Sequence, residues 1–72
     1  MRITYDAEVD AMSIIFRETT VTTQQLAEGI AIDYDSGAKI AGIGLLDAVK
    51  RLGGDETLRR VTLEVLALTK SA

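Results

Sequence analysis

The chain has 72 residues, with eleven Asp and Glu against eight Lys and Arg, and it contains no Cys, His, Trp or Pro. This composition excludes a disulfide framework, a Cys/His zinc site, a Cys nucleophile and a His general base. Because no run of about 18 apolar residues and no basic leader before an apolar core is found, we expect no membrane span, no signal peptide and a cytoplasmic address.

The length predicts a single domain over residues 1–72, one too small to bury its apolar residues alone. Surface scaling gives about 60% burial for a lone chain of this size, which is the marginal regime. Yet 47% of the residues are hydrophobic. We therefore expect a homo-oligomer, with a dimer favoured, in which a second chain completes the core.

The first half of the chain predicts one hairpin, a loop and a further strand. Residues 2–5 and 11–17 alternate polar and apolar side chains, which is typical of strands, and the acidic residues 6–10 between them predict a turn. The Thr- and Gln-rich residues 18–25 predict a connecting loop, and residues 26–34 a third strand.

A second hairpin is expected at Asp35-Ser36-Gly37. This tripeptide is typical of a type I turn with a following bulge, in which Gly37 takes a positive φ. The predicted register pairs Tyr34 with Ala38, Asp33 with Lys39 and Ile32 with Ile40. A fourth strand over residues 39–46 would then carry Ile43 and Leu45 on the face opposite to Ile40. The hairpin would be apolar on both faces, so two layers would have to cover it.

The C-terminal third predicts short helical pieces and one ambiguous segment. Residues 47–52 fit a short helix capped by Asp47, and Gly53-Gly54 would end it. A turn is expected at residues 55–58. Val61–Leu68 fits either a strand at about residues 60–66 or a C-terminal helix, and both alternatives stay open. The predicted fold class is α+β, mostly β: an antiparallel β-meander of four to five strands with a short helix.

Three segments carry a resemblance to a known family. They are Tyr5-Asp6-Ala7-Glu8-Val9-Asp10-Ala11, Glu28-Gly29-Ile30-Ala31-Ile32-Asp33-Tyr34-Asp35 and Gly42-Ile43-Gly44-Leu45-Leu46-Asp47-Ala48. In order and spacing they resemble a small prokaryotic family known as domain of unknown function 2283, over about residues 1–52. Two departures are Gly44, where Glu is common, and Met12-Ser13, where Leu-Tyr is common.

The resemblance implies a compact, often self-associating β-meander without catalytic residues. Some relatives are encoded beside small toxin-like proteins, which implies an antitoxin-like role as an alternative. If the common Glu had a role in a site, this chain would lack it at Gly44.

Acidic residues supply two candidate sites. Asp6, Glu8 and Asp10 have the spacing of the first calcium ligands of an EF-hand loop, but the sixth and twelfth positions are Ala11 and Arg17. We interpret them as a solvated turn. The pair Asp33 and Asp35 could serve as general acid and base, but beside a turn we expect a turn former and a cross-strand ion partner.

Basic and small residues supply the remaining candidates. Residues 1–38 hold seven acids and two bases, whereas residues 39–72 hold four acids and six bases. A basic group (Lys50, Arg51, Arg59 and Arg60) could contact nucleic acid, but a net charge of −3 and three aromatic residues favour an acidic protein partner or subunit orientation. No His activates Ser13, and we expect solvated side chains at Lys39, Lys50 and Lys70. Gly42 and Gly44 predict a bulge or tight packing.

We accordingly assign no catalytic, cofactor-binding or metal-binding residue. The expected function is that of a non-enzymatic, self-associating protein–protein interaction module, with neither a membrane nor a nucleic acid as partner. The alternatives are an antitoxin-like binder, or a small metal-binding or hydrolytic enzyme that uses the acidic turn.

Overall fold

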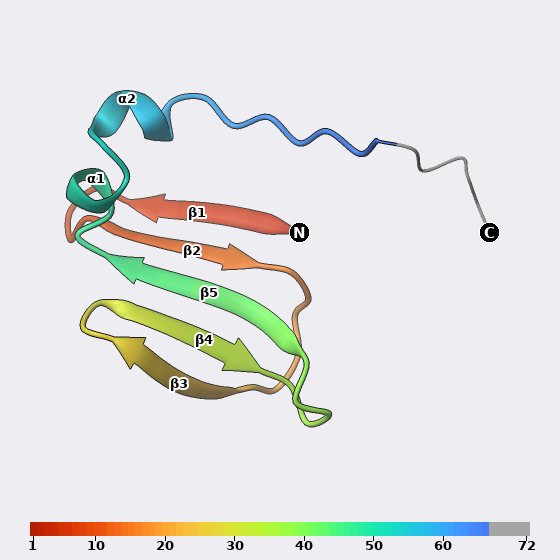
Figure 1. The fold of residues 1–72 in the computed structure, drawn as a ribbon. Coiled ribbons are helices and arrows are strands. Elements are labelled where there is room, and N and C mark those ends of the chain that lie inside the picture. The colour runs from red at the N-terminus through yellow and green to blue at the C-terminus, as the bar shows by residue number, and fades with distance from the viewer. Residues whose placement is uncertain (67–72) are drawn as a thin grey trace.

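A computed structural model describes residues 1–66 and shows one open, antiparallel sheet with two short helices at one end (Figure 1). The sheet order is β1-β2-β5-β4-β3. The elements in chain order are β1 (Arg2–Asp6), β2 (Ala11–Ile15), β3 (Thr22–Ala27), β4 (Ile30–Tyr34), β5 (Ile40–Leu46), α1 (Ala48–Arg51) and α2 (Asp55–Leu58). The predicted mostly-β class, with its short helix, is confirmed.

The strand order differs from the simple meander that we predicted. The last strand, β5, lies between β2 and β4, so the connection after β2 crosses to the far edge of the sheet. The central place suits β5 because Ile40–Leu46 contains no charged residue. A strand with neighbours on both sides and little polar character is best shielded from water in the middle of a sheet.

A hairpin that the sequence analysis missed forms the β3 edge. We predicted a loop at residues 18–25 and one strand at 26–34, and the boundary between them is wrong. A turn at Glu28-Gly29 divides this region into two strands, β3 and β4. Gly29 adopts a φ of +81°, which glycine takes without steric cost. All six residues of β3 are exposed, so this edge strand has no buried side that would impose apolar alternation.

The register between β4 and β5 is also different from our prediction. All three predicted pairs are wrong: Tyr34 with Ala38, Asp33 with Lys39 and Ile32 with Ile40. The observed pairs are Tyr34 with Ile40, Asp33 with Gly42 and Ile32 with Ile43. Ala41 is the additional residue on β5, a β-bulge. It is 1% exposed, and its carbonyl oxygen accepts a hydrogen bond from the Phe16 amide at 2.8 Å. The residue with positive φ in the preceding turn is Ala38 instead of Gly37.

The bulge places the large apolar residues of the β4–β5 hairpin, except Leu46, on one face, which corrects the predicted two-sided hairpin. Ile43 and Leu45 now share a face with the apolar residues of β4. Two cross-strand rows form this apolar face: Ile3, Ile14, Ile43 and Ile32, and next to them Tyr5, Met12, Leu45 and Ile30. The adjoining row on the opposite face is small and polar: Thr4, Ser13, Gly44 and Ala31.

The C-terminal region confirms the helical predictions and corrects the strand. The helix within residues 47–52 and the turn at 55–58 are present as α1 and α2. Asp47 has a φ of 55° and its side chain makes no cap hydrogen bond, so the predicted cap is wrong. Residues 60–66 form neither the strand nor the helix considered for Val61–Leu68, whose last two residues lie outside the described ones. No helix within residues 1–66 has the length and apolar character needed to cross a membrane.

Candidate functional site

The acidic turn between β1 and β2 uses two of its carboxylates to hold the fold together. Asp6 accepts a hydrogen bond from the Glu8 amide at 2.9 Å, which is an Asx-turn. Asp10 accepts one from the Tyr5 hydroxyl at 2.7 Å and another from the Val49 amide at 3.0 Å. Among the described residues no cluster of three metal-ligating side chains is found. Asp6 and Glu8 are exposed, as we expected of a solvated turn, whereas Asp10 is half-buried and bound within the fold.

Asp10 caps α1 from a distance in sequence, in place of Asp47. Its carbonyl oxygen accepts a hydrogen bond from the Ala48 amide at 3.1 Å, while its side chain takes the Val49 amide. These amides are two of the four at a helix start that lack an intrahelical partner. The hydrogen bond to Asp10 raises the pKa of Tyr5, and desolvation and nearby carboxylates act in the same direction.

Arg51, which we had placed in a basic group, joins α1 to the sheet. Its guanidinium donates to the carbonyl oxygen of Leu46 at 2.9 Å and to that of Glu28 at 2.5 Å. A Cβ at Gly29 would lie 2.6 Å from the Arg51 Nη2, so the guanidinium would have to shift to accommodate it. We name Asp10, Ala48, Arg51 and Gly29 together the α1 corner. Ala48 is fully buried there.

The other basic residues of this predicted group do not share one contact in the described part of the chain. Arg59 pairs with Asp55 at 3.4 Å, one helical turn away. Lys50 lies in the last turn of α1, where a positive charge favours the helix dipole. Arg51 binds carbonyl oxygens and Arg59 binds Asp55, whereas Lys50 and Arg60 are exposed, so the predicted basic group does not act as one unit.

Asp33 and Asp35, the candidate acid–base pair, do not act together in the structure, because each carboxylate has its own hydrogen-bond partners. Asp33 accepts a hydrogen bond from the Thr23 hydroxyl at 2.5 Å. Asp35 accepts from the amides of Gly37 and Lys39, each at 2.9 Å, and forms an ion pair with Arg17 at 2.7 Å. The Lys39 amide, followed by the Arg17 guanidinium, lowers the pKa of Asp35. The prediction of a turn former is confirmed for Asp35; the ion partner expected for Asp33 is wrong.

The two glycines of β5 differ in their surroundings. A Cβ at Gly42 would lie 3.1 Å from the Ile14 carbonyl oxygen, so the predicted tight packing is confirmed at this position. A Cβ at Gly44 would meet nothing within 4 Å. Ser13 and Ala31 flank Gly44 in the same row, and together they border a shallow hollow that is lined mostly by apolar residues. Of the nucleophile candidates, Lys70 lies outside the described residues.

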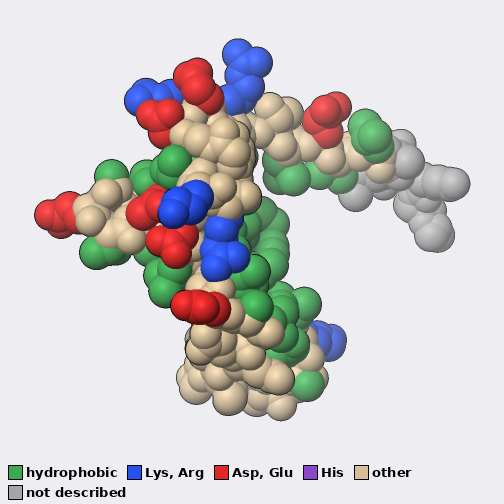
Figure 2. Space-filling view, turned by 60° about the vertical axis from the view of Figure 1, so that its left-hand side comes forward, with side chains coloured by type: hydrophobic (Ala, Val, Ile, Leu, Met, Phe, Trp, Pro, Cys, Tyr) green, Lys and Arg blue, Asp and Glu red, His purple; other side chains and the backbone are tan. Residues whose placement is uncertain are grey.

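The largest feature without a partner in the chain is the apolar face. Figure 2 shows hydrophobic side chains gathered along one side of the sheet, and the charged ones mostly elsewhere. Ile3 is 41% exposed and Tyr5 37%, and the five residues of β2 and of β4 are half-buried. Within residues 1–66, only Ala41 and Ala48 are buried hydrophobic residues. In the part of the chain that the structure describes, no second sheet or long helix covers this face.

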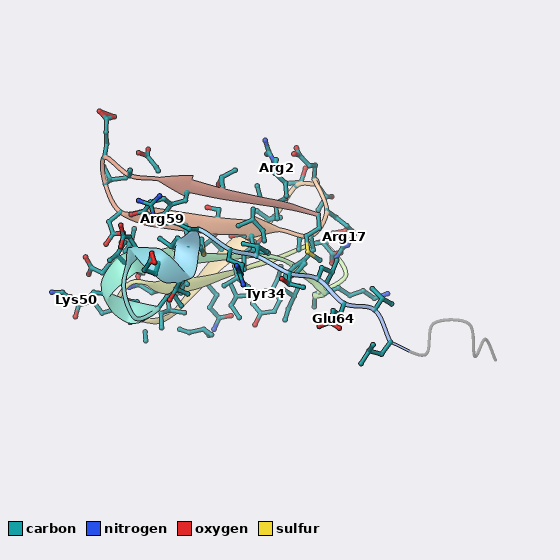
Figure 3. The ribbon with its side chains drawn as sticks, turned by 90° about the horizontal axis from the view of Figure 1, so that it is seen from above. Arg2, Arg17, Tyr34, Lys50, Arg59 and Glu64 are labelled. Atoms are coloured by element: carbon teal, nitrogen blue, oxygen red, sulfur yellow. The ribbon has the colours of Figure 1, made fainter. Side chains whose placement is uncertain are left out.

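The segment after α2 stands over one end of this face. Leu58, Val61 and Leu63 line a hollow together with the sheet residues Met1, Ile3, Tyr5 and Met12. The segment runs out past the sheet without entering it (Figure 3). The hollow could not be found from the residues alone, because it depends on the path of the chain after α2.

Comparison with known proteins identifies a family and nothing closer. Residues 2–48, about two thirds of the chain, match the family described as protein of unknown function (DUF2283). No curated protein and no solved structure matches the chain. The chain belongs to this family of unknown function, as its three motif segments indicated.

Proposed function

We propose that this member of the family is a non-enzymatic, self-associating interaction module whose apolar face packs against a second copy of the chain. The observation that carries the proposal is the one-sided sheet. Eight apolar side chains form two adjacent rows across four strands, and within residues 1–66 only α2 and the segment after it stand over one end of these rows. A sheet with an apolar face needs a second layer to exclude water from it.

The residues of the face remain accessible to a partner. Ile3 and Tyr5 are 41% and 37% exposed, and the five residues of β2 and of β4 are only half-buried. A second copy packed on the face would bury these side chains, and an interface of ordinary size takes roughly 800 Å² from each partner.

The charge distribution is compatible with two identical faces in contact. Neither row of the apolar face contains a charged residue, whereas Arg2, Asp6 and Asp33 belong to the opposite face. A two-fold interface places the same patch on both subunits, so a charged patch would repel itself. An uncharged face with aromatic and Met residues also has the composition of an interface centre.

The test is the assembly state of the variant Ile43→Asp, measured by native mass spectrometry and analytical ultracentrifugation. We expect wild type to be dimeric and the variant to be monomeric or unfolded, because Ile43 lies in the middle of its row. Ile3→Asp, on an edge strand, is a second variant expected to keep the fold. Val9→Asp is the matched control: Val9 is an exposed apolar residue in the β1–β2 turn, away from the face.

An unchanged dimer in both face variants would overturn the proposal, as would a wild-type monomer. Native mass spectrometry of the protein purified gently from prokaryotic cytoplasm adds one more outcome. A stoichiometric foreign polypeptide in place of a second copy would contradict self-association and favour the antitoxin-like alternative. Circular dichroism of each variant separates loss of assembly from loss of folding.

A further inference from the structure

The segment Val61–Leu66 has the pattern of a strand but no strand to pair with. Val61, Leu63 and Val65 alternate with Thr62 and Glu64, and these three apolar side chains are 63%, 73% and 59% exposed. Among the described residues, no backbone hydrogen bond joins this segment to the sheet. An extended segment with alternating exposed apolar residues buries nothing by itself, so its stabilising contacts must come from another surface.

The sheet offers an edge with the matching pattern. β1 pairs with β2 on one side only, its other edge is open, and all five of its residues are exposed. Ile3 and Tyr5 belong to the apolar face, whereas Arg2 and Thr4 point to the opposite one. An open edge presents unpaired amides and carbonyls, which an added strand can satisfy.

One antiparallel register matches the two segments on both faces. With Leu63 opposite Ile3, Val61 falls opposite Tyr5, Thr62 opposite Thr4 and Glu64 opposite Arg2. The apolar pairs extend the apolar face by one strand, and the opposite charges meet on the other face. A slip of one residue would place Leu63 opposite Arg2 or Thr4 and send every side chain to the wrong face.

The single chain does not make this pairing, although it contains both parts. The segment runs beside β1 in the opposite direction (Figure 1), but it stands over the apolar face, where Val61 and Leu63 line the hollow above Ile3. Arg2 instead pairs with Glu18 at 2.8 Å, and Figure 3 shows Arg2 and Glu64 on opposite sides of the sheet. The segment therefore lies on the side where the proposed second copy would pack.

We infer that residues 61–65 add as a sixth strand to the β1 edge of a second copy, with Leu63 opposite Ile3. In a two-fold dimer the exchange occurs twice, once from each chain. Gly53 and Gly54, with φ of +93° and +115°, form the link between α1 and α2, which precedes the segment. The inference rests on the proposed self-association and names a second contact between the same two chains.

The test uses paired cysteines, since the chain contains none of its own. Chains with Ile3→Cys and chains with Leu63→Cys are mixed, unfolded, refolded together and oxidised, and the covalent dimer is measured on a non-reducing gel. We expect a heterodimeric band joining the two variants. Thr62→Cys in place of Leu63→Cys is the control, because its side chain would point to the other face, and we expect several-fold less product.

Each result distinguishes this inference from the proposed function. A dimer by native mass spectrometry without the Ile3→Cys/Leu63→Cys product overturns the exchange and leaves self-association in place. A doubly substituted chain that oxidises within itself, as an unlinked monomer of altered mobility, also overturns the exchange, because the strand then returns to its own sheet. A chain that is monomeric by native mass spectrometry overturns both.

A charge reversal supplies a readout that needs no cross-link. Arg2→Glu and Glu64→Arg should each weaken the dimer about two- to fivefold, the size expected of an exposed cross-strand ion pair. The double variant should recover wild-type affinity if the two residues face each other across chains. Additive losses in the double variant would contradict the register.

Discussion

The α1 corner and the apolar face differ in whether their groups find partners within the chain. In the corner, Asp10 and Arg51 satisfy backbone groups of α1, β5 and the β3–β4 turn, and Ala48 is fully buried. On the face, large side chains such as Ile3 and Tyr5 remain exposed. The corner is complete within one chain, whereas the face is not.

The difference shows that the family motifs and the alternating apolar residues have different structural roles. Asp10, Gly29 and Asp35 belong to the motif segments, and each fixes a turn or a helix start. The alternating apolar residues supply a surface that only another layer can bury. Changes in the corner should therefore alter the stability of the folded chain, whereas changes on the face should alter assembly.

The largest effect within the corner is expected for Asp10→Ala. The variant loses the cap on α1 and the Tyr5 hydrogen bond, and it leaves Ala at a residue whose φ is 55°. We expect the free energy of unfolding, measured by urea denaturation, to fall by about 2–3 kcal/mol. Asp10→Asn is the control, since Asn tolerates this φ and keeps an acceptor; it should lose less than about 1 kcal/mol. If Asp10→Ala instead dissociated the dimer and left the free energy of unfolding unchanged, the corner would act in assembly and not in the stability of the folded chain.

A smaller effect should separate two glycines on the same sheet. Gly29→Ala places a Cβ against the Arg51 guanidinium at a φ of +81°, and we expect a loss of about 1–2 kcal/mol. Gly44→Ala meets no atom within 4 Å and should gain about 0.5 kcal/mol, because alanine loses less backbone entropy in a strand. Thermal unfolding of both variants at one protein concentration checks the pair. Equal losses of stability in the two variants would show that the surroundings of Gly29 are no tighter than those of Gly44.

The smallest effect concerns Asp35 and appears only in acid. Its carboxylate is favoured in the folded chain by the amides of Lys39 and Gly37 and by Arg17, so its folded pKa lies below the ordinary value of 3.8. A lowered folded pKa contributes stability that is present above the unfolded pKa and is lost as pH falls through the folded pKa.

Asp35→Asn should therefore flatten the fall in unfolding temperature as the pH drops below the ordinary carboxyl pKa of 3.8. Asp47→Asn is the control, because the Asp47 side chain makes no cap hydrogen bond. The measurement is a series of thermal scans at acidic pH. If the unfolding temperature of Asp35→Asn fell with pH as steeply as that of wild type, other carboxylates would govern acid unfolding.

Much of the fold could be predicted because its signals are local. Strands β1, β2 and β5 follow from alternation and composition, and α1 and α2 from glycines and charges within a few residues of them. The β3–β4 hairpin was missed because both sides of an exposed edge strand are polar, so no alternation marks it. The cap on α1 was assigned to the adjacent Asp47, whereas Asp10, distant in sequence, supplies it.

The candidate site was less predictable than the fold. From the residues we expected self-association from apolar excess, but we placed Ile43 and Leu45 on a second apolar face. The structure places them with Ile30 and Ile32 on one face. The same eight residues thus require one additional layer instead of two, which a single two-fold partner can provide.

The sequence by itself determined the class, the family and the excess of apolar residues, since these depend on composition, alternation and short motifs. Only the tertiary structure decided which way the apolar residues point. One additional residue, Ala41, shifts the pairing of β4 with β5, and because side chains alternate with a period of two, the shift transfers half of β5 to the other face. A bulge depends on the neighbouring strands, here on the Phe16 amide bound to the Ala41 carbonyl, and no local pattern within β5 encodes that neighbour.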